Sequence, residues 1–178
     1  LHLAPAGLKV SAPRTFAAID PGTHMGWALW REDMKNPVFG TWKFEWGTDG
    51  QRLNGVQRKL HQLSTDYGGS GLIPLGFDPH VLGYGWKHSI EMYAAAYRIP
   101  IRLVTTQQWR LDFIGRQEDK IIRDARKAAK AAGQDFKSRD KLKAATVARC
   151  RQLGWAVRND NEADALGQLD TQIKENGI

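Results

Sequence analysis

The sequence of 178 residues has a single cysteine, Cys150, and no long hydrophobic run. A lone cysteine excludes an intramolecular disulfide and a zinc site built from several cysteines. No segment is long enough to span a membrane, and the first fifteen residues lack the charged and apolar regions of a secretory signal. We therefore expect a cytoplasmic protein without a membrane partner, with a flexible N-terminal arm over 1–15 and one domain over 16–178.

Acidic residues are scarce relative to basic residues in one segment of the chain. Overall, 26 Lys and Arg stand against 19 Asp and Glu, which gives a net charge of +7. The segment from Arg116 to Arg151 has twelve Lys or Arg and five Asp or Glu, so it holds the whole excess. A basic face indicates a polyanionic partner. The alternative is a solvated helix surface, although such surfaces usually mix the two signs more evenly.

Hydrophobic periodicity divides the domain into three early strands and a later alternation of helices and strands. The expected strands are 16–20, 26–31, 38–46, 72–78 and 99–106. The expected helices are 49–67, 89–97, 107–113, two around Gly133, and 161–173. Short turns between the first three strands favour an antiparallel meander, and the later alternation predicts an α/β fold with a mixed five-stranded sheet flanked by helices.

Carboxylates occur where they could converge. Two expected strands end in an aspartate, Asp20 and Asp78, and both would lie at the same sheet edge if the strands are adjacent. The last helix adds Asp160 and Asp164 at i and i+4, with Asn161 on the same face. Mg²⁺ and Mn²⁺ prefer oxygen ligands, and a pair of such ions can activate water and stabilise the leaving oxygen of a phosphodiester.

The same residues also have structural interpretations. Asp20 and Asp78 each precede a proline and could open turns. Asn159, with Glu162 three residues later, fits a helix capping box, which would make Asp160 a first-turn acid favoured by the helix dipole. The residues leave both interpretations open, although the structural one must account for three separate coincidences.

Several motifs resemble those of RuvC-type Holliday junction resolvases, within the RNase H-like, retroviral integrase superfamily. "IDPGTHMGWALW" is similar to the first motif of this family, and "NEADAL" to its C-terminal aspartate-bearing helix. "IPIRLVTTQQWR" and a lysine-bearing helix follow in the family order, so the resemblance runs from Phe16 to Gln172. It is greatest to the phage-encoded branch, which implies the cytoplasm of a bacterial host. It also implies an RNase H-like fold, here with a basic helical insertion.

The resemblance implies a homodimer that binds four-way DNA junctions, with each subunit cutting one strand. It implies a metal-dependent endodeoxyribonuclease with four acidic ligands that hold Mg²⁺ or Mn²⁺, two ions per active site. By motif position, Asp20, Asp78 and Asp164 are expected as catalytic metal ligands, with Asn161 as the fourth ligand and Asp160 beside it. Two positions depart from the family: it usually has Glu at Asp78, which is one methylene longer, and an acid or histidine at Asn161, where the amide brings no charge.

The basic insertion is the expected DNA-binding surface, because phosphate contacts from Lys and Arg supply most nucleic-acid affinity. Lys137 and Lys141 fall where the family has a lysine near the scissile phosphate, which makes Lys141 a catalytic candidate. Tyr84, in the loop after the fourth strand, could stack on unpaired bases, whereas its neighbour Trp86 could equally pack in the core or a dimer interface. The other DNA-binding candidates are Lys120, Arg123, Arg126, Lys127 and Lys130.

The residues leave three other functions open. A sugar-kinase or actin-like ATPase shares the Asp-x-Gly-Thr turn, but it needs two related domains and a second glycine-rich phosphate loop. A RuvC-like protein that binds branched DNA but cuts poorly is suggested by Asp78 and Asn161. Cleavage of RNA–DNA hybrids is the third.

Overall fold

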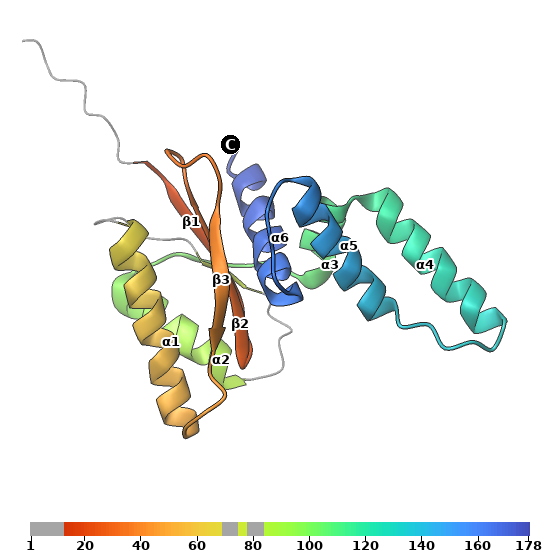
Figure 1. The fold of residues 1–178 in the computed structure, drawn as a ribbon. Coiled ribbons are helices and arrows are strands. Elements are labelled where there is room, and N and C mark those ends of the chain that lie inside the picture. The colour runs from red at the N-terminus through yellow and green to blue at the C-terminus, as the bar shows by residue number, and fades with distance from the viewer. Residues whose placement is uncertain (1–12, 69–74, 78–83) are drawn as a thin grey trace, which may run out of the picture.

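The computed structural model describes residues 13–68, 75–77 and 84–178, and it has one sheet between two layers of helices (Figure 1). The sheet has the strand order β3-β2-β1-β4-β5. β1 pairs antiparallel with β2, and β2 antiparallel with β3, whereas β4 is parallel to both β1 and β5. The predicted mixed α/β architecture with an antiparallel meander is confirmed. The strands are β1 (Thr15–Asp20), β2 (His24–Arg31), β3 (Val38–Lys43), β4 (Leu75–Phe77) and β5 (Ile101–Leu103).

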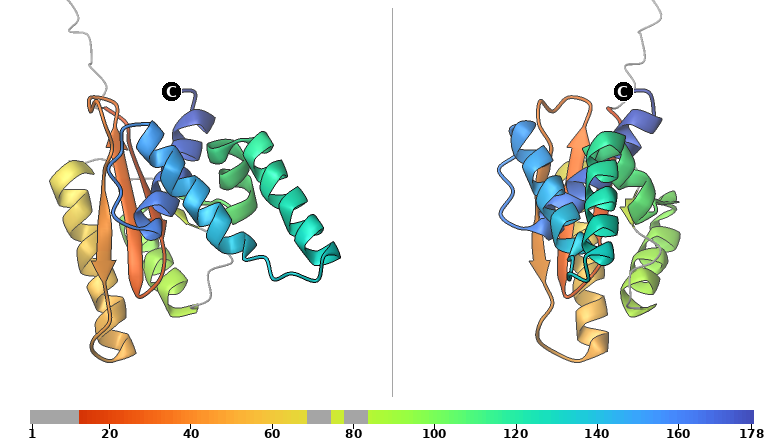
Figure 2. Two further views of the ribbon diagram at one scale, coloured as in Figure 1. Left: turned by 45° about the vertical axis from the view of Figure 1, so that its right-hand side comes forward. Right: turned by 90° about the vertical axis from the view of Figure 1, so that its right-hand side faces the viewer.

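The helices form two layers and a projecting hairpin (Figures 1 and 2). α1 and α2 cover one face of the sheet, and α6 covers the other, with α3 and α5 packed against it. α4 packs on α3 and α5 and lies outermost from the sheet. The helices are α1 (Asp49–Leu63), which continues into a π-helical turn (Ser64–Gly68), α2 (Tyr84–Tyr97), α3 (Thr106–Ile114), α4 (Arg116–Ala131), α5 (Ser138–Gln152) and α6 (Asp160–Glu175).

The alternation of side chains along β1 determines which face each residue occupies. Ala17 and Ile19 belong to the core cluster beneath α1 and α2, whereas Phe16 and Ala18 belong to the cluster beneath α6. Asp20 follows Phe16 and Ala18 at the same two-residue spacing and so occupies the same face of β1. The carboxylate that ends β1 is therefore directed to the α6 face of the sheet.

Helix α6 lies unusually close to the sheet because glycines face it from two strands. A Cβ added at Gly26 would overlap the Asn161 carbonyl, and one added at Gly76 would overlap the Gln172 side-chain amide. The Gln172 amide donates a hydrogen bond of 3.3 Å to the Ala17 carbonyl oxygen. These contacts fix the whole length of α6, from its first turn to its last, over β1, β2 and β4.

Several boundaries differ from the expected ones. β3 ends at Lys43 instead of residue 46, because its pairing with β2 ends where Lys43 meets His24. α2 begins at Tyr84, five residues earlier than expected. At the N-terminus Thr15 is already part of β1, and residues 1–12 of the expected arm lie outside the described residues. No helix in the described part of the chain is long and apolar enough to cross a membrane.

Candidate active site

The end of β1 and the first turn of α6 meet at one edge of the sheet. Asp20 is paired with Gly26 in the antiparallel register, and Gly26 lies against the main chain of Asn161. Asp20 is half-buried at this edge. Gly26 therefore lies beside Asp20 in the sheet and directly beneath Asn161 of α6. β4 runs parallel to β1, so its carboxyl end points to the same edge, as expected.

Hydrogen bonds to the side chains of Asn159 and Glu162 hold the start of α6 in place. The Asn159 side chain accepts a hydrogen bond of 2.9 Å from the Glu162 main-chain N–H, which confirms the predicted N-cap. Glu162 is fully buried, and its carboxylate accepts from the main chain of Arg158 at 2.8 Å and from its guanidinium. The Thr41 hydroxyl also lies 3.3 Å from it. Glu162 therefore has a structural role that fixes the register of Asp160, Asn161 and Asp164.

Among the described carboxylates of the proposed set, Asp164 is the most buried, with 8% of its surface exposed. Its Oδ2 atom accepts a hydrogen bond of 3.3 Å from Arg110, whereas its buried Oδ1 atom has no hydrogen-bond partner among the described residues. Burial raises the pKa of Asp164 to about 6; the charges of Arg110 and Lys143 oppose the rise, and that of Asp160 adds to it. Asp164 thus holds an unsatisfied acceptor atom in a poorly solvated position.

Asp160 lies one turn earlier on the same face and has a different electrostatic environment. Burial disfavours its charged form, but the hydrogen bond and charge of Lys143 prevail and hold the pKa of Asp160 below its usual value. Lys143 forms an ion pair with the Asp160 Oδ2 atom. The two neighbouring carboxylates are therefore each paired with a cation from a different helix, α3 for Asp164 and α5 for Asp160.

Neither of these cations was predicted from the sequence. Arg110 stands in "TTQQWR", where the N-cap Thr105 starts α3, and its guanidinium also lies 4.9 Å from the centroid of the Trp109 ring. Lys143 is only two residues from the catalytic candidate Lys141. Residues two apart on a helix differ by about 200°, so exposed Lys141 does not share the face that reaches Asp160. The structure therefore pairs Lys143, and not Lys141, with the carboxylates.

The other predicted site residues are distributed as follows. Asp78 lies outside the described residues, and Tyr84 is the first residue of α2. Trp86 packs against Phe44 with ring centroids 5.6 Å apart, which favours the packing interpretation of this residue. Lys137 is exposed and occupies the N-cap position of α5.

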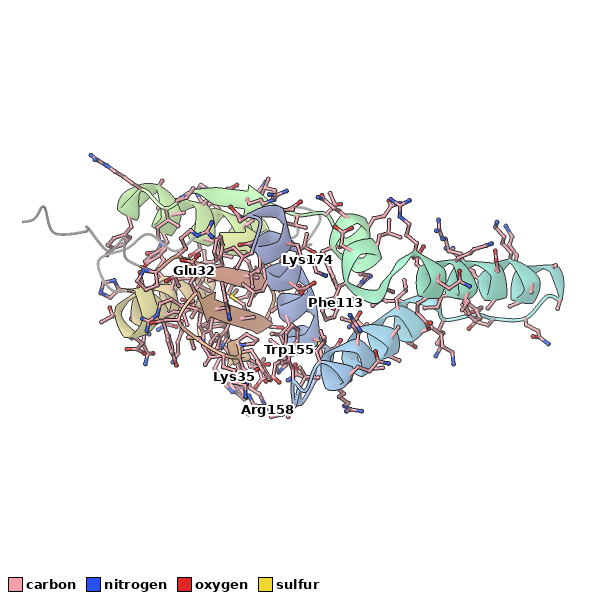
Figure 3. All side chains as sticks on the ribbon, turned by 90° about the horizontal axis from the view of Figure 1, so that it is seen from above. Glu32, Lys35, Phe113, Trp155, Arg158 and Lys174 are labelled. Atoms are coloured by element: carbon pink, nitrogen blue, oxygen red, sulfur yellow. The ribbon has the colours of Figure 1, made fainter. Side chains whose placement is uncertain are left out.

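Helix α4 presents its cations on an open surface. Figure 3 shows the α4–α5 hairpin extending away from the sheet, with side chains along α4 in the open. Ile122 is the only buried residue of α4, so the rest of this helix is at least partly accessible to solvent. At about 100° per residue, five of its cations fall within a band about 80° wide. These cations, called here the α4 band, are Arg116, Lys120, Arg123, Lys127 and Lys130.

Two details modify the predicted DNA-binding set. Arg126 lies outside the α4 band, turned by about 100° from Lys127, whereas Arg116 belongs to the band and was not among the candidates. Arg123 forms an ion pair with Asp119 one turn earlier, at 2.5 Å, so part of its charge is already compensated.

The donor set at this edge decides whether a divalent metal fits the site. Among the described residues, no three His, Cys, Asp or Glu side chains are arranged to bind one ion. This leaves aside Asp78, which is not described, and the amide of Asn161. The orphaned Oδ1 atom of Asp164 is an acceptor of the kind that a cation satisfies. The donors at this edge are all oxygens, which fits Mg²⁺ or Mn²⁺ better than softer metals.

Comparisons with known proteins identify the fold. No family model matches the sequence, and no curated protein matches it. Among solved structures, RuvC from T. thermophilus in complex with a Holliday junction substrate matches with a TM-score of 0.56 and 12% identity, covering 92% of this chain and 96% of that one. Another structure of Thermus thermophilus RuvC gives a TM-score of 0.54 and 14% identity, with 90% and 93% covered. The fold is therefore similar to that of RuvC, and nothing in the comparison favours the phage-encoded branch.

Proposed function

We propose that the protein is a metal-dependent endodeoxyribonuclease that resolves four-way DNA junctions. The observation that supports the proposal is that the end of β1, at Asp20, meets the first turn of α6, at Asn161, in a RuvC-like fold, with Asp164 one turn further along α6. The fold supports a nuclease, and one of its structural neighbours is RuvC in complex with a Holliday junction substrate. Branched DNA is accordingly the proposed substrate, and a homodimer the proposed assembly.

The proposed ligands are Asp20, Asp78, Asn161 and Asp164, with Asp160 adjoining them. When bound, Mg²⁺ or Mn²⁺, two ions per site, would supply an activated water and stabilise the leaving oxygen of the phosphodiester. The chain contributes a buried acceptor, the Asp164 Oδ1 atom, which has no hydrogen-bond partner among the described residues. Arg110 and Lys143 hold Asp164 and Asp160 in position and reduce the repulsion between these two carboxylates.

The same observations favour a second candidate, a RuvC-like protein that binds branched DNA with weak or absent cleavage. Asn161 brings no charge, and each of the two helix carboxylates is already compensated by a cation. Metal affinity then depends on whether the ion competes with Arg110 and Lys143. This dependence gives the two candidates different outcomes in one assay.

The deciding experiment is cleavage of a labelled four-way junction in Mg²⁺ and in Mn²⁺, with a linear duplex and an RNA–DNA hybrid as controls. We expect incisions in the junction alone. Asp20→Asn should abolish cleavage and keep junction binding, because it removes a ligand but leaves the α4 band intact. Junction binding without incision in either metal would establish the second candidate. Preferred cleavage of the hybrid would overturn both in favour of an RNase H activity.

A further inference from the structure

Trp46 is the most exposed large hydrophobic side chain of the described residues, with 87% of its surface accessible. The preceding aromatic residues are packed: Trp42 stacks on Trp27 at 5.6 Å, and Phe44 lies against Trp86. Trp46 follows the end of β3, where the chain no longer has a strand partner. Tryptophan is highly buried on average in folded proteins. Its exposure alone implies no function, so its surroundings decide what the ring can do.

Trp46 lines an open groove of about 700 Å³ between the end of β3 and helix α1. Phe44, Gly47 and Gly55 also line it, and the Phe44 ring lies against Gly55. The four charged residues that line the groove are all cations, namely Lys43, Arg52, Arg58 and Lys59. An aromatic face beside several cations is the composition that proteins use for single-stranded nucleic acid, with bases on the ring and phosphates on the cations.

Two of the groove cations, Arg52 and Lys59, lie on the same side of α1, whereas Lys43 comes from the end of β3 and Arg58 is turned by about 100° from Lys59. Arg52 and Lys59 are seven residues apart, which places them two turns apart on the same face. The Nε atom of Arg52 is buried without a hydrogen-bond partner among the described residues. Two acids lie nearby without lining the groove: Glu45 pairs with His24 at 2.5 Å, and Asp49 is 3.8 Å from Arg52 and points into solvent. The groove itself therefore remains positive.

The groove lies at the active-site end of the sheet. The Phe44 main-chain N–H donates a hydrogen bond of 2.8 Å to the carbonyl of Thr23, three residues after Asp20. α1 covers the face opposite to α6, so the groove and the carboxylate cluster are on opposite faces of the same edge. A strand that passes around this edge would contact both places.

We infer that the groove, called here the Trp46 groove, binds an unpaired stretch of single-stranded DNA. One base stacks on Trp46, and the flanking phosphates contact Arg58 and Lys59. This inference deepens the proposed function, on which it rests for its biological substrate: opening of base pairs at the centre of a bound junction would supply the unpaired nucleotides. The binding itself needs neither metal nor cleavage.

The test measures affinity of the full chain for a labelled oligothymidine of about fifteen nucleotides, in EDTA, by fluorescence anisotropy. Trp46→Ala should weaken binding by about five- to 150-fold, the range of one base–aromatic stacking interaction. Trp46→Phe should retain most of the affinity. The double variant Arg58→Gln/Lys59→Gln should reduce the slope of log affinity against log salt by about 0.7 for each phosphate that it no longer neutralises. Lys35→Gln, at an exposed position three residues before β3 begins, is the control and should leave binding unchanged.

Each outcome decides one hypothesis separately. Unchanged oligothymidine affinity in Trp46→Ala overturns the groove inference, even if the wild type cleaves junctions. Reduced affinity in Trp46→Ala supports it, even if the wild type cleaves nothing and the nuclease proposal fails. Equal reductions in Trp46→Ala, Trp46→Phe and Lys35→Gln would show a general effect on folding and would overturn the inference. So would a wild type that binds no oligothymidine, in which case the exposed ring is better explained by a protein partner.

Discussion

Replacement of Asp164 by Asn should stabilise the metal-free protein at neutral pH while it removes a proposed metal ligand. Asp164 is buried, and its pKa is raised from 3.8 to about 6. At pH 7 the folded protein must therefore hold a charge in a place that disfavours it. Asn has the same shape and no charge, so it relieves this cost.

The magnitude follows from the pKa shift. A rise of about two units corresponds to about 3 kcal/mol at a pH above both values, since each unit is worth about 1.36 kcal/mol. Asn adds an amide donor at a position where Asp164 Oδ1 finds no partner, and this can cost about 1–2 kcal/mol. We therefore expect Asp164→Asn to raise the free energy of unfolding by about 1–2 kcal/mol at pH 7.5.

The pH dependence has a defined sign. The folded state binds more protons than the unfolded state between the two pKa values, so the contribution of Asp164 to stability is greatest below pH 4. It declines as the pH rises through about 6. Urea unfolding in EDTA at pH 4 and pH 7.5 measures this change. The difference between wild type and Asp164→Asn should grow with pH, and added Mg²⁺ should stabilise only the wild type.

Asp160→Asn is the matched control on the same helix face. The pKa of Asp160 is lowered by Lys143, so its charge favours the fold, and neutralising it should give no stabilisation at pH 7.5. If the free energies of unfolding of Asp164→Asn and wild type fall in parallel between pH 4 and pH 7.5, the ionisation of Asp164 does not destabilise the fold. That result would refute the conclusion that the Asp164 carboxylate is poorly solvated and is stabilised by a bound cation.

Three further changes test the proposed site and its surroundings. Asn161→Asp should strengthen Mn²⁺ binding measured by calorimetry, and Asp78→Glu should maintain or raise junction cleavage in Mg²⁺, which demands stricter geometry than Mn²⁺; lower values would contradict the ligand assignments. Gly26→Ala should destabilise the fold by about 1–3 kcal/mol in urea because its methyl group would overlap Asn161, whereas Gly50→Ala, with open space around it, should not. Replacement of all five α4 candidates by glutamine should reduce the slope of log junction affinity against log salt by about 0.9 for each phosphate that is no longer neutralised. The total reduction should be smaller than five such contacts would give, because not every candidate faces the DNA. An unchanged slope would show that α4 is not part of the DNA-binding surface. These candidates are Lys120, Arg123, Arg126, Lys127 and Lys130.

The placement of Asp20 and Asp164 could be predicted because it depends on local patterns. A short continuous apolar run that is broken by Pro21-Gly22 identifies β1, and the last residue of the run lies at the end of the strand. Helical spacing puts Asp160 and Asp164 on one face whatever the rest of the fold does. The prediction also needed two long-range assumptions. The parallel pairing of Ala17 with Leu75 confirms that β1 and β4 are adjacent, and the contact of Gly26 with Asn161 places the start of α6 beside β1.

The cations at the site could not be predicted in the same way. Arg110 is 54 residues from its partner Asp164, and Lys143 is 17 residues from Asp160. Which basic residue meets a carboxylate depends on how α3 and α5 pack on α6, and a two-residue difference on α5 reverses the face. Motif position indicated Lys141, whereas the geometry selects Lys143. The exposure of Trp46 likewise depends on where the pairing of β3 with β2 ends, and the alternation of aromatic residues continues past that point.

A count of charges along the sequence likewise does not predict where positive surfaces form in the fold. Outside the segment from Arg116 to Arg151 the formal charges cancel, which predicts a neutral remainder. In the fold, however, acids of that remainder are engaged away from the groove, as in the pairs of Glu32 with Arg14 and Asp170 with Lys174. The residues that line the Trp46 groove include four cations and no acid, and Asp49 pairs with Arg52 from outside this lining. Two positive surfaces, the α4 band and the groove, thus arise in a chain whose charge count predicts one, and a substrate bound at the carboxylate edge would lie between them.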